Sequence, residues 1–171
     1  MAPQTSAKSG EGVNGGGAAS ASPTAPADYA ALNAVFGALL AGVVVAARER
    51  SQESNPLTPQ DLAITGAATF ALAKVIARER IGTWVREPFV EEENGRKRPR
   101  GRGIRHAVGE LVTCTRCVGA WSALGLVGLR LASPPTGRVV NDVLAVSAMN
   151  DWLQASFKLL CAKTDEVGGR G

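Results

Sequence analysis

Four apolar segments alternate with polar stretches along this chain. They cover Tyr29 to Ala47, Leu62 to Ala77 with an extension to Trp84, Leu111 to Leu131, and Val139 to Cys161. The first is about as long as a helix must be to cross the ~30 Å hydrocarbon core of a bilayer. Alanine and glycine recur at every fourth position in the first two segments. This spacing lines one helix face with small side chains, as in packed membrane helices, although an alanine-rich composition alone would produce it too.

The third and fourth segments are less clearly transmembrane. The third has only 13 uninterrupted apolar residues, from Cys117 to Leu129, and such a stretch also fits a buried helix of a soluble protein. The fourth carries a polar stripe, so it needs partner helices or lies on the surface with the stripe in water. We therefore predict an all-α fold, a small multi-pass helical membrane bundle of three to four transmembrane helices. A soluble helical protein with the same apolar faces in its core is the competing interpretation.

The polar stretches divide the chain into regions. Residues 1–28 are rich in Ala, Gly, Ser and Pro, cannot bury enough apolar surface to order themselves, and are predicted to be disordered. Residues 29–47 form a candidate transmembrane helix, residues 61–161 a membrane-embedded helical domain with a basic loop at 86–106, and residues 162–171 a flexible tail. The loop shows no alternation typical of strands, and Ser133 to Gly137 predict a tight turn.

The loop between the second and third segments determines the expected orientation. Residues 78–110 contain nine Lys or Arg and six Glu, and short basic loops stay on the cytoplasmic side of a membrane. This predicts a cell-membrane protein with loop 78–110 and the carboxyl end in the cytoplasm. Nucleic-acid binding is not expected, because the basic run lacks interleaved aromatic residues for base stacking. A flexible protein-binding loop is the other alternative.

No catalytic set is evident, so the chain is interpreted as a non-enzyme. It has no glycine-rich phosphate loop or metalloprotease helix, and its one histidine, His106, lies in the basic loop. Lys74 and Asp151 are ionisable residues within apolar segments, where such groups usually have a function or a partner. If the second and fourth segments run in the same direction, the two residues lie at similar depth, and we predict that they pair or share a polar pocket.

The cysteines are the remaining chemical candidates. Cys114 and Cys117 are three residues apart at the start of the third segment, which would place both sulfur atoms on one face of a helix turn. They can act as small buried hydrophobes, a thiol redox pair, or two ligands of a metal. Cys161 and His106 are predicted at the same depth, so a Cys3His zinc site is conceivable, although no cofactor is predicted.

The sequence around the cysteine pair also resembles a known family. The residues Gly109-Glu110-Leu111-Val112-Thr113-Cys114-Thr115-Arg116-Cys117-Val118-Gly119-Ala120-Trp121, with residues 68–76 and Arg86-Glu87-Pro88-Phe89, are similar to the bacterial domain of unknown function 1360, whose sporulation-associated members are named YjcA-like. Thr115 stands where the signature has proline, and Ala71 where arginine is common. The resemblance marks Gly109, Glu110, Thr113, Gly119 and Trp121 as motif residues. It implies a small multi-pass membrane protein and no known activity.

Two functions follow from this sequence. The first is a structural or assembly role in the lipid bilayer, with a second copy or another membrane protein as partner. The alternative is a membrane-bound thiol redox or metal-binding protein that uses Cys114 and Cys117.

Overall fold

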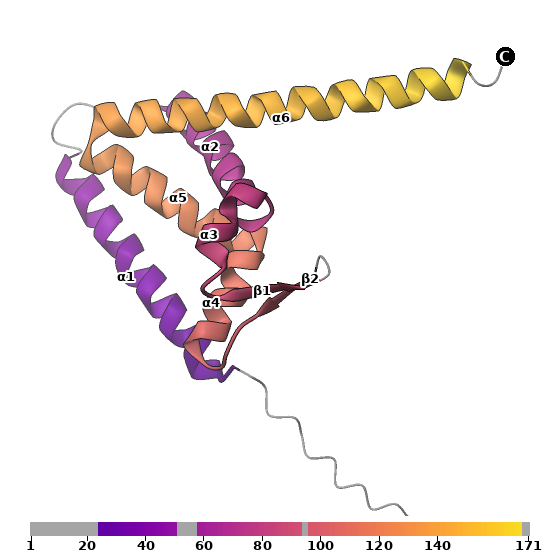
Figure 1. Cartoon of the computed structure of the whole chain (residues 1–171). Helices are drawn as coiled ribbons and strands as arrows, with labels where there is room; N and C mark the ends of the chain where they lie inside the picture. The colour runs from indigo at the N-terminus through magenta and orange to yellow at the C-terminus, as the bar shows by residue number, and fades with distance from the viewer. Residues whose placement is uncertain (1–23, 51–57, 94–95, 169–171) are drawn as a thin grey trace, which may run out of the picture.

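The computed structural model describes residues 24–50, 58–93 and 96–168, and most of these are helical (Figure 1). In chain order the elements are α1 (Pro26–Arg50), α2 (Pro59–Ala77), the 3-10 turn η1 (Arg80–Gly82), α3 (Thr83–Arg86), β1 (Val90–Glu93), β2 (Arg96–Pro99), α4 (Ile104–Thr113), α5 (Thr115–Ala132) and α6 (Pro134–Gly168). The predicted helical character is confirmed. Residues 1–23 of the predicted disordered segment lie outside the described residues. The prediction is wrong for residues 26–28, because α1 already begins at Pro26.

Helix α2 is the central element of the bundle, since it packs against both α5 and α6. It begins with a capping box, in which the Thr58 hydroxyl accepts from the Asp61 N–H at 3.1 Å and the Asp61 carboxylate accepts from the Thr58 N–H at 3.0 Å. These reciprocal bonds satisfy donors that a helix start leaves unpaired. The helix therefore begins at Pro59, three residues before the apolar segment that predicts it.

The predicted extension of this helix to Trp84 is wrong. Helix α2 ends at Ala77, and its last carbonyls are capped by two cations from later in the chain. The buried guanidinium of Arg86 donates to the carbonyls of Ile76 and Glu79, and Lys97 Nζ donates to the Ala77 carbonyl at 2.8 Å. Positive groups favour the negative end of a helix dipole. Burial lowers the pKa of Lys97 below its usual value.

The basic loop contains a β-hairpin, contrary to the absence of strands expected from its sequence. Strands β1 and β2 are antiparallel, and three acidic residues lie opposite three basic ones: Glu91 opposite Arg98, Glu92 opposite Lys97, and Glu93 opposite Arg96. Opposite charges facing each other across two strands stabilise the pairing. The sequence signal that we missed is Asn94-Gly95 between the two strands, a typical hairpin turn dipeptide.

Two further boundaries differ from the prediction. The third segment is broken, with α4 and α5 meeting at 91°. The turn predicted from Ser133 to Gly137 is shorter, because α6 already begins at Pro134, where proline fits the first helical position. The predicted flexible tail is instead helical up to Gly168, and the outer half of α6 extends beyond the rest of the molecule (Figure 1).

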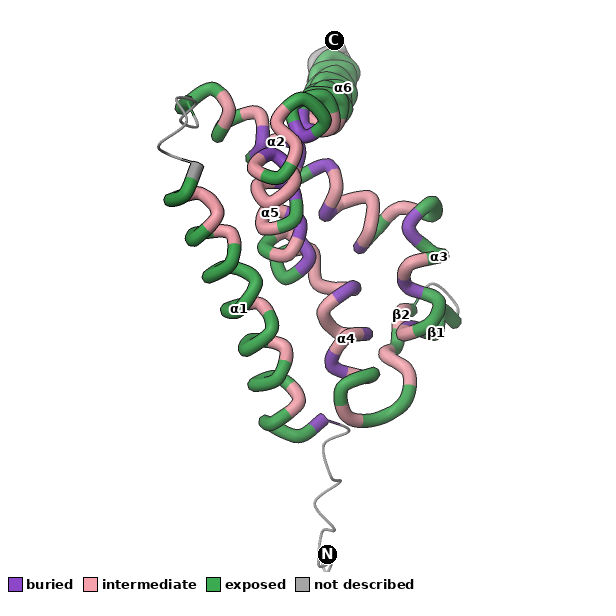
Figure 2. Tube along the Cα trace, turned by 90° about the vertical axis from the view of Figure 1, so that its left-hand side faces the viewer, coloured by how far each residue is buried: buried purple, intermediate pink, exposed green. Residues whose placement is uncertain are grey.

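The buried residues of the bundle are mostly small, and many of the large apolar residues are exposed. Figure 2 shows that exposed and half-buried positions alternate along α1, while buried positions lie on the helices behind it. Six of the ten buried apolar residues are alanines, and no large side chain is fully buried among the described residues. The large apolar residues that are exposed include five on α1: Val35, Leu39, Leu40, Val44 and Val45. This arrangement reverses the usual sorting of a soluble domain, which buries large aliphatic and aromatic residues.

Two described helices, α1 and α2, are long and apolar enough to cross a membrane, or three if α4 and α5 form one broken span. Helix α1 contains the candidate transmembrane segment 29–47, and it meets this test. Among the described helices α6 does not meet this test, so the structure offers two to three candidate spans where three to four were predicted.

The close packing at the end of α2 makes a direct test of the fold. A Cβ atom at Gly82 would lie 2.8 Å from the Ile76 carbonyl oxygen and closer still to that of Val75. We expect Gly82→Ala to lower the free energy of unfolding by about 1–3 kcal/mol, the usual range for overpacking. Gly125→Ala in α5 is the matched control, because nothing lies within 4 Å of the added atom. It should raise stability by up to about 1 kcal/mol through helix propensity, and equal effects of the two changes would contradict this account.

Candidate functional site

Cys114 forms the corner between α4 and α5. Its backbone is extended, with φ −90° and ψ 106°, and its N–H closes α4 by donating to the carbonyls of Glu110 at 3.1 Å and Leu111 at 3.2 Å. Its sulfur atom then accepts from the N–H of Cys117 at 3.3 Å and caps the start of α5. Thr115 is the first residue of α5, a position that also suits the proline of the family signature. The substitution therefore leaves the corner intact.

The two cysteine sulfur atoms lie side by side at this corner. The Cys117 thiol donates to Cys114 Sγ at a sulfur–sulfur distance of 2.7 Å. We predicted that both sulfur atoms lie on one face of a helix turn. The sulfur atoms are close together, but Cys114 is the N-cap of α5 and does not belong to the helix. A cap sulfur at the positive end of a helix is stabilised as a thiolate. In this pair Cys117 is the donor and Cys114 Sγ is the acceptor.

Both cysteines line a cavity of about 420 Å³ between α1, α4 and α5. The Tyr29 hydroxyl of α1 donates to the Glu110 carboxylate at one side of this cavity. Phe36 of α1 meets Trp121 of α5 edge to face, with ring centroids 5.2 Å apart. Apolar residues make up most of the remaining wall: Leu32, Ala107, Leu111 and Ala120. The cavity thus combines a dithiol, a carboxylate and aromatic rings.

The predicted motif residues fall into two groups in space. Glu110, Cys114, Cys117 and Trp121 line the cavity. The other three serve packing and hydrogen bonding. A Cβ on Gly109 would lie 2.6 Å from the Phe89 carbonyl oxygen, and Gly119 lets α5 approach Ala73 of α2. The Thr113 hydroxyl donates to the carbonyls of Gly109 and Glu110.

The four residues of the conceivable zinc site are not brought together. His106 lies near Glu110, with 3.7 Å between Nε2 and Oε1, while Cys161 is exposed on the outer half of α6. In the parts of the chain that the structure describes, no three His, Cys, Asp or Glu side chains are grouped to hold a metal ion. Cys114 and Cys117 remain a pair.

Comparison with known proteins identifies the family. The profile described as "Protein of unknown function (DUF1360)" matches residues 64–157, more than half of the chain. The chain belongs to the DUF1360 family. No curated protein and no solved structure matches it. The matched region contains α2 from residue 64 onward, α5, the hairpin and the cysteine corner, but it excludes α1, which supplies one wall of the cavity. The YjcA-like and sporulation-associated features remain expectations.

Within the DUF1360 region, the predicted pairing of Lys74 with Asp151 is confirmed. Lys74 Nζ donates to Asp151 Oδ2 at 3.0 Å and lies 3.4 Å from Glu79 Oε1. Both side chains of the pair are about one-third exposed, at 33% and 32%. The pair joins α2 to α6 near the end of α2 that carries the cationic caps.

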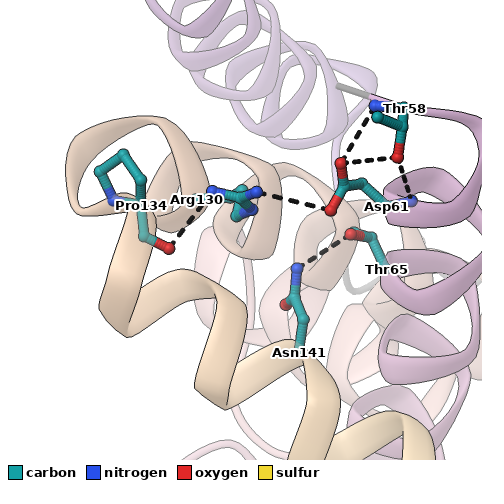
Figure 3. Close-up of polar contacts among 6 residues, drawn as sticks. All are labelled: Thr58, Asp61, Thr65, Arg130, Pro134 and Asn141. Atoms are coloured by element: carbon teal, nitrogen blue, oxygen red, sulfur yellow. Dashed lines mark hydrogen bonds and ion pairs between the residues drawn. The ribbon is translucent and has the colours of Figure 1, made fainter. Parts of the chain in front are cut away.

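Sequence reasoning missed a second polar cluster at the opposite end of α2 (Figure 3). Buried Arg130 donates to Asp61 Oδ1 at 3.4 Å and to the Pro134 carbonyl at 3.2 Å. Buried Asn141 donates to the Thr65 hydroxyl at 2.9 Å. Arg130 looked like the boundary of an apolar run. The available signal was that a charge beside such a run needs a partner once it is buried.

The Lys74–Asp151 contact can be measured by a double-mutant cycle. We expect Lys74→Met and Asp151→Asn each to lower the free energy of unfolding, and the double variant to be less stable than the parent by less than the sum. The coupling should be about 0.5–1 kcal/mol, because the pair is partly screened by solvent. Lys158→Met with Asp151→Asn is the matched control, since Lys158 has no ion pair among the described residues. Additive effects of Lys74→Met and Asp151→Asn would contradict the contact.

Proposed function

We propose that this chain is an integral membrane protein in which α1, α2 and α5 cross the bilayer. The observation that supports this proposal is the exposure of large apolar side chains around a core of small residues. In water such a surface would form an aggregation-prone patch. In lipid the same surface is solvated, and small interior residues allow helices to pack closely. The lipid bilayer is then the partner that covers α1 and the outer faces of the bundle.

The orientation follows from the contacts between helix ends. Tyr29 at the start of α1 reaches Glu110 in α4, so the amino end of α1 lies at the same end of the bundle as the basic loop. Helix α6 has the same direction as α2, because Thr65 pairs with Asn141 and Lys74 with Asp151, but it lies across the other end of the bundle (Figure 1) and does not define the end that carries the basic loop. With nine Lys or Arg in residues 78–110, we assign this end to the cytoplasm. Arg48 then lies at the outer end of α1, but the nine positive residues of the loop outnumber it.

This orientation is tested by labelling intact cells with a membrane-impermeant maleimide. We expect Thr136→Cys, in the exposed corner between α5 and α6, to be labelled above the parent, and Gly95→Cys in the hairpin not to be labelled until the cells are opened. The parent chain corrects for its three native cysteines. Labelling of Gly95→Cys in intact cells, with Thr136→Cys protected, would reverse the orientation.

For the site itself we propose a redox-active dithiol. The observation that supports this role is the approach of the two sulfur atoms, one of which caps a helix and accepts a hydrogen bond from the other. On the cytoplasmic side thiols are kept reduced, and disulfides that form there are usually transient and catalytic. A metal role has less support, since a structural zinc needs four ligands and the described residues assemble only two thiols here.

The exchange reaction assigns a different task to each cysteine. Cys114, as the thiolate, attacks one sulfur of a substrate disulfide, forms a mixed disulfide and releases the first substrate thiolate. Cys117 then loses its proton and attacks Cys114 Sγ, which releases the second substrate thiolate and leaves the Cys114–Cys117 disulfide. The substrate is reduced by two electrons, and the protein is oxidised by two. The apolar cavity walls favour a disulfide carried on an apolar segment.

The dithiol is tested by equilibrating the full chain in micelles with glutathione buffers and counting free thiols by alkylation and mass spectrometry. We expect Cys114 and Cys117 to oxidise together, with a midpoint between about −270 and −120 mV, the range of thiol oxidoreductases. Cys117→Ser should accumulate a mixed disulfide with glutathione at Cys114, and Cys114→Ser should accumulate much less at Cys117. Cys161→Ser is the matched control and should leave the midpoint unchanged.

A pair that stays reduced in oxidised glutathione would contradict the dithiol role. So would stoichiometric zinc that is lost when both cysteines are changed to serine, which would establish the metal alternative. If the pair stays reduced, we propose the structural or assembly role in place of the dithiol role. The outer half of α6 favours it, since this helix leaves Trp152, Leu153, Phe157, Leu159 and Leu160 exposed for a second copy or another membrane protein.

A further inference from the structure

A second cavity lies between α2 and α5, on the side of α5 away from the cysteine cavity. Its volume is about 530 Å³, and three of the residues that line it are cationic: Lys74, Arg78 and Arg116. No thiol or carboxylate lines it. The concentration of positive charge in one groove points to an anionic ligand.

The charged residues are grouped at one end of this groove. Helices α2 and α5 are antiparallel, because Asp61 meets Arg130 at one end and Ala73 approaches Gly119 toward the other. Arg78 near the end of α2 and Arg116 in the first turn of α5 are therefore at the same level. This level is the cytoplasmic boundary in the proposed orientation. The N-terminus of α5 adds partial positive charge there.

Two of these cations are available for a ligand. Lys74 is paired with Asp151 and Glu79. Arg78 and Arg116 are exposed, and in the described parts of the chain neither has an ion pair. Two arginines without acidic partners at one end of a groove can hold a phosphate group through charge-assisted hydrogen bonds.

The other end of the groove is apolar and has an open floor. Gly66 and Gly119 contribute no side chain, and an added Cβ at Gly66 would meet nothing within 4 Å. Phe70 is half-exposed and forms a wall beside Ala73. From Gly66 to Arg78 the groove extends over twelve residues of α2, or about 18 Å at 1.5 Å per residue. One charged end and one long apolar end match the shape of a phospholipid.

We propose that this groove binds an anionic phospholipid from the cytoplasmic leaflet, with its phosphate between Arg78 and Arg116 and an acyl chain along Gly66, Phe70 and Gly119. The proposal rests on the membrane placement of α2 and α5 and is independent of the thiol chemistry. A soluble chain would already be evident from purification without detergent, so failure of the lipid site and failure of the membrane placement are distinguishable.

The test uses the full chain in a neutral detergent, with dioleoyl phosphatidylglycerol as the probe and bound lipid measured by native mass spectrometry. Dioleoyl phosphatidylcholine, which has the same chains and no net charge, and inorganic phosphate are the comparison ligands. We expect phosphatidylglycerol to bind most tightly. The double variant Arg78→Gln, Arg116→Gln should weaken the binding of phosphatidylglycerol about thirtyfold, because each lost cation contributes roughly 1 kcal/mol.

The matched control is Arg80→Gln with Arg102→Gln, two exposed arginines of the same loop that do not line the groove. This control should change the affinity for phosphatidylglycerol by no more than about twofold in either direction. Equal weakening by the two double variants would overturn the proposal in favour of general attraction to the basic loop. Equal binding of phosphatidylcholine would also overturn it. Stabilisation by inorganic phosphate to the same degree as by phosphatidylglycerol would overturn the lipid assignment and indicate a free phosphate ligand.

Discussion

The proposed membrane placement depends on one constraint: large apolar side chains lie exposed around a core of small residues and need an apolar surrounding. Helix α1 packs against α4 and α5 along one side only, and its remaining faces present valine and leucine. The interior cannot provide the stabilisation of a water-soluble core, because its apolar residues are mainly alanines. Small residues instead bring the backbones together, as at Gly119 against Ala73 and Gly128 against Val43. Such packing suits a solvent that is itself hydrocarbon.

In the proposed bilayer each unpaired polar group would be costly, and the polar groups around α2 are accordingly paired. At one end Arg130 pairs with Asp61, and at the other Lys74 pairs with Asp151. Between them Asn141 reaches Thr65. The last carbonyls of α2 are capped by Arg86 and Lys97. These contacts come from different helices and from the hairpin, and together they determine the register and direction of α5 and α6 relative to α2.

Much of the fold could be predicted from sequence because the apolar segments are long. The Lys74–Asp151 pair could be predicted too, since depth along two helices with the same direction places both residues at one level. The break at Cys114 could not, because neither glycine nor proline occurs from Leu111 to Val118, and the cap depends on a sulfur atom.

Other features depend on tertiary contacts between distant residues. The Arg86 cap joins a guanidinium to carbonyls ten and seven residues earlier, and only the turn after α2 brings them together. The cavity was missed because α1 supplies Tyr29 and Phe36 from outside the family region. The cysteine signature identified the right residues, but their shared cavity appears only when α1 packs across the corner.

The most direct test of this account is whether the chain is an integral membrane protein. Membranes from cells that produce it are washed with high salt and then with alkaline carbonate, in the absence of detergent. We expect the chain to remain in the sedimented membranes and to be released only by detergent, because its large apolar side chains face lipid. Recovery of folded, monodisperse chain in the carbonate or salt wash would contradict the account.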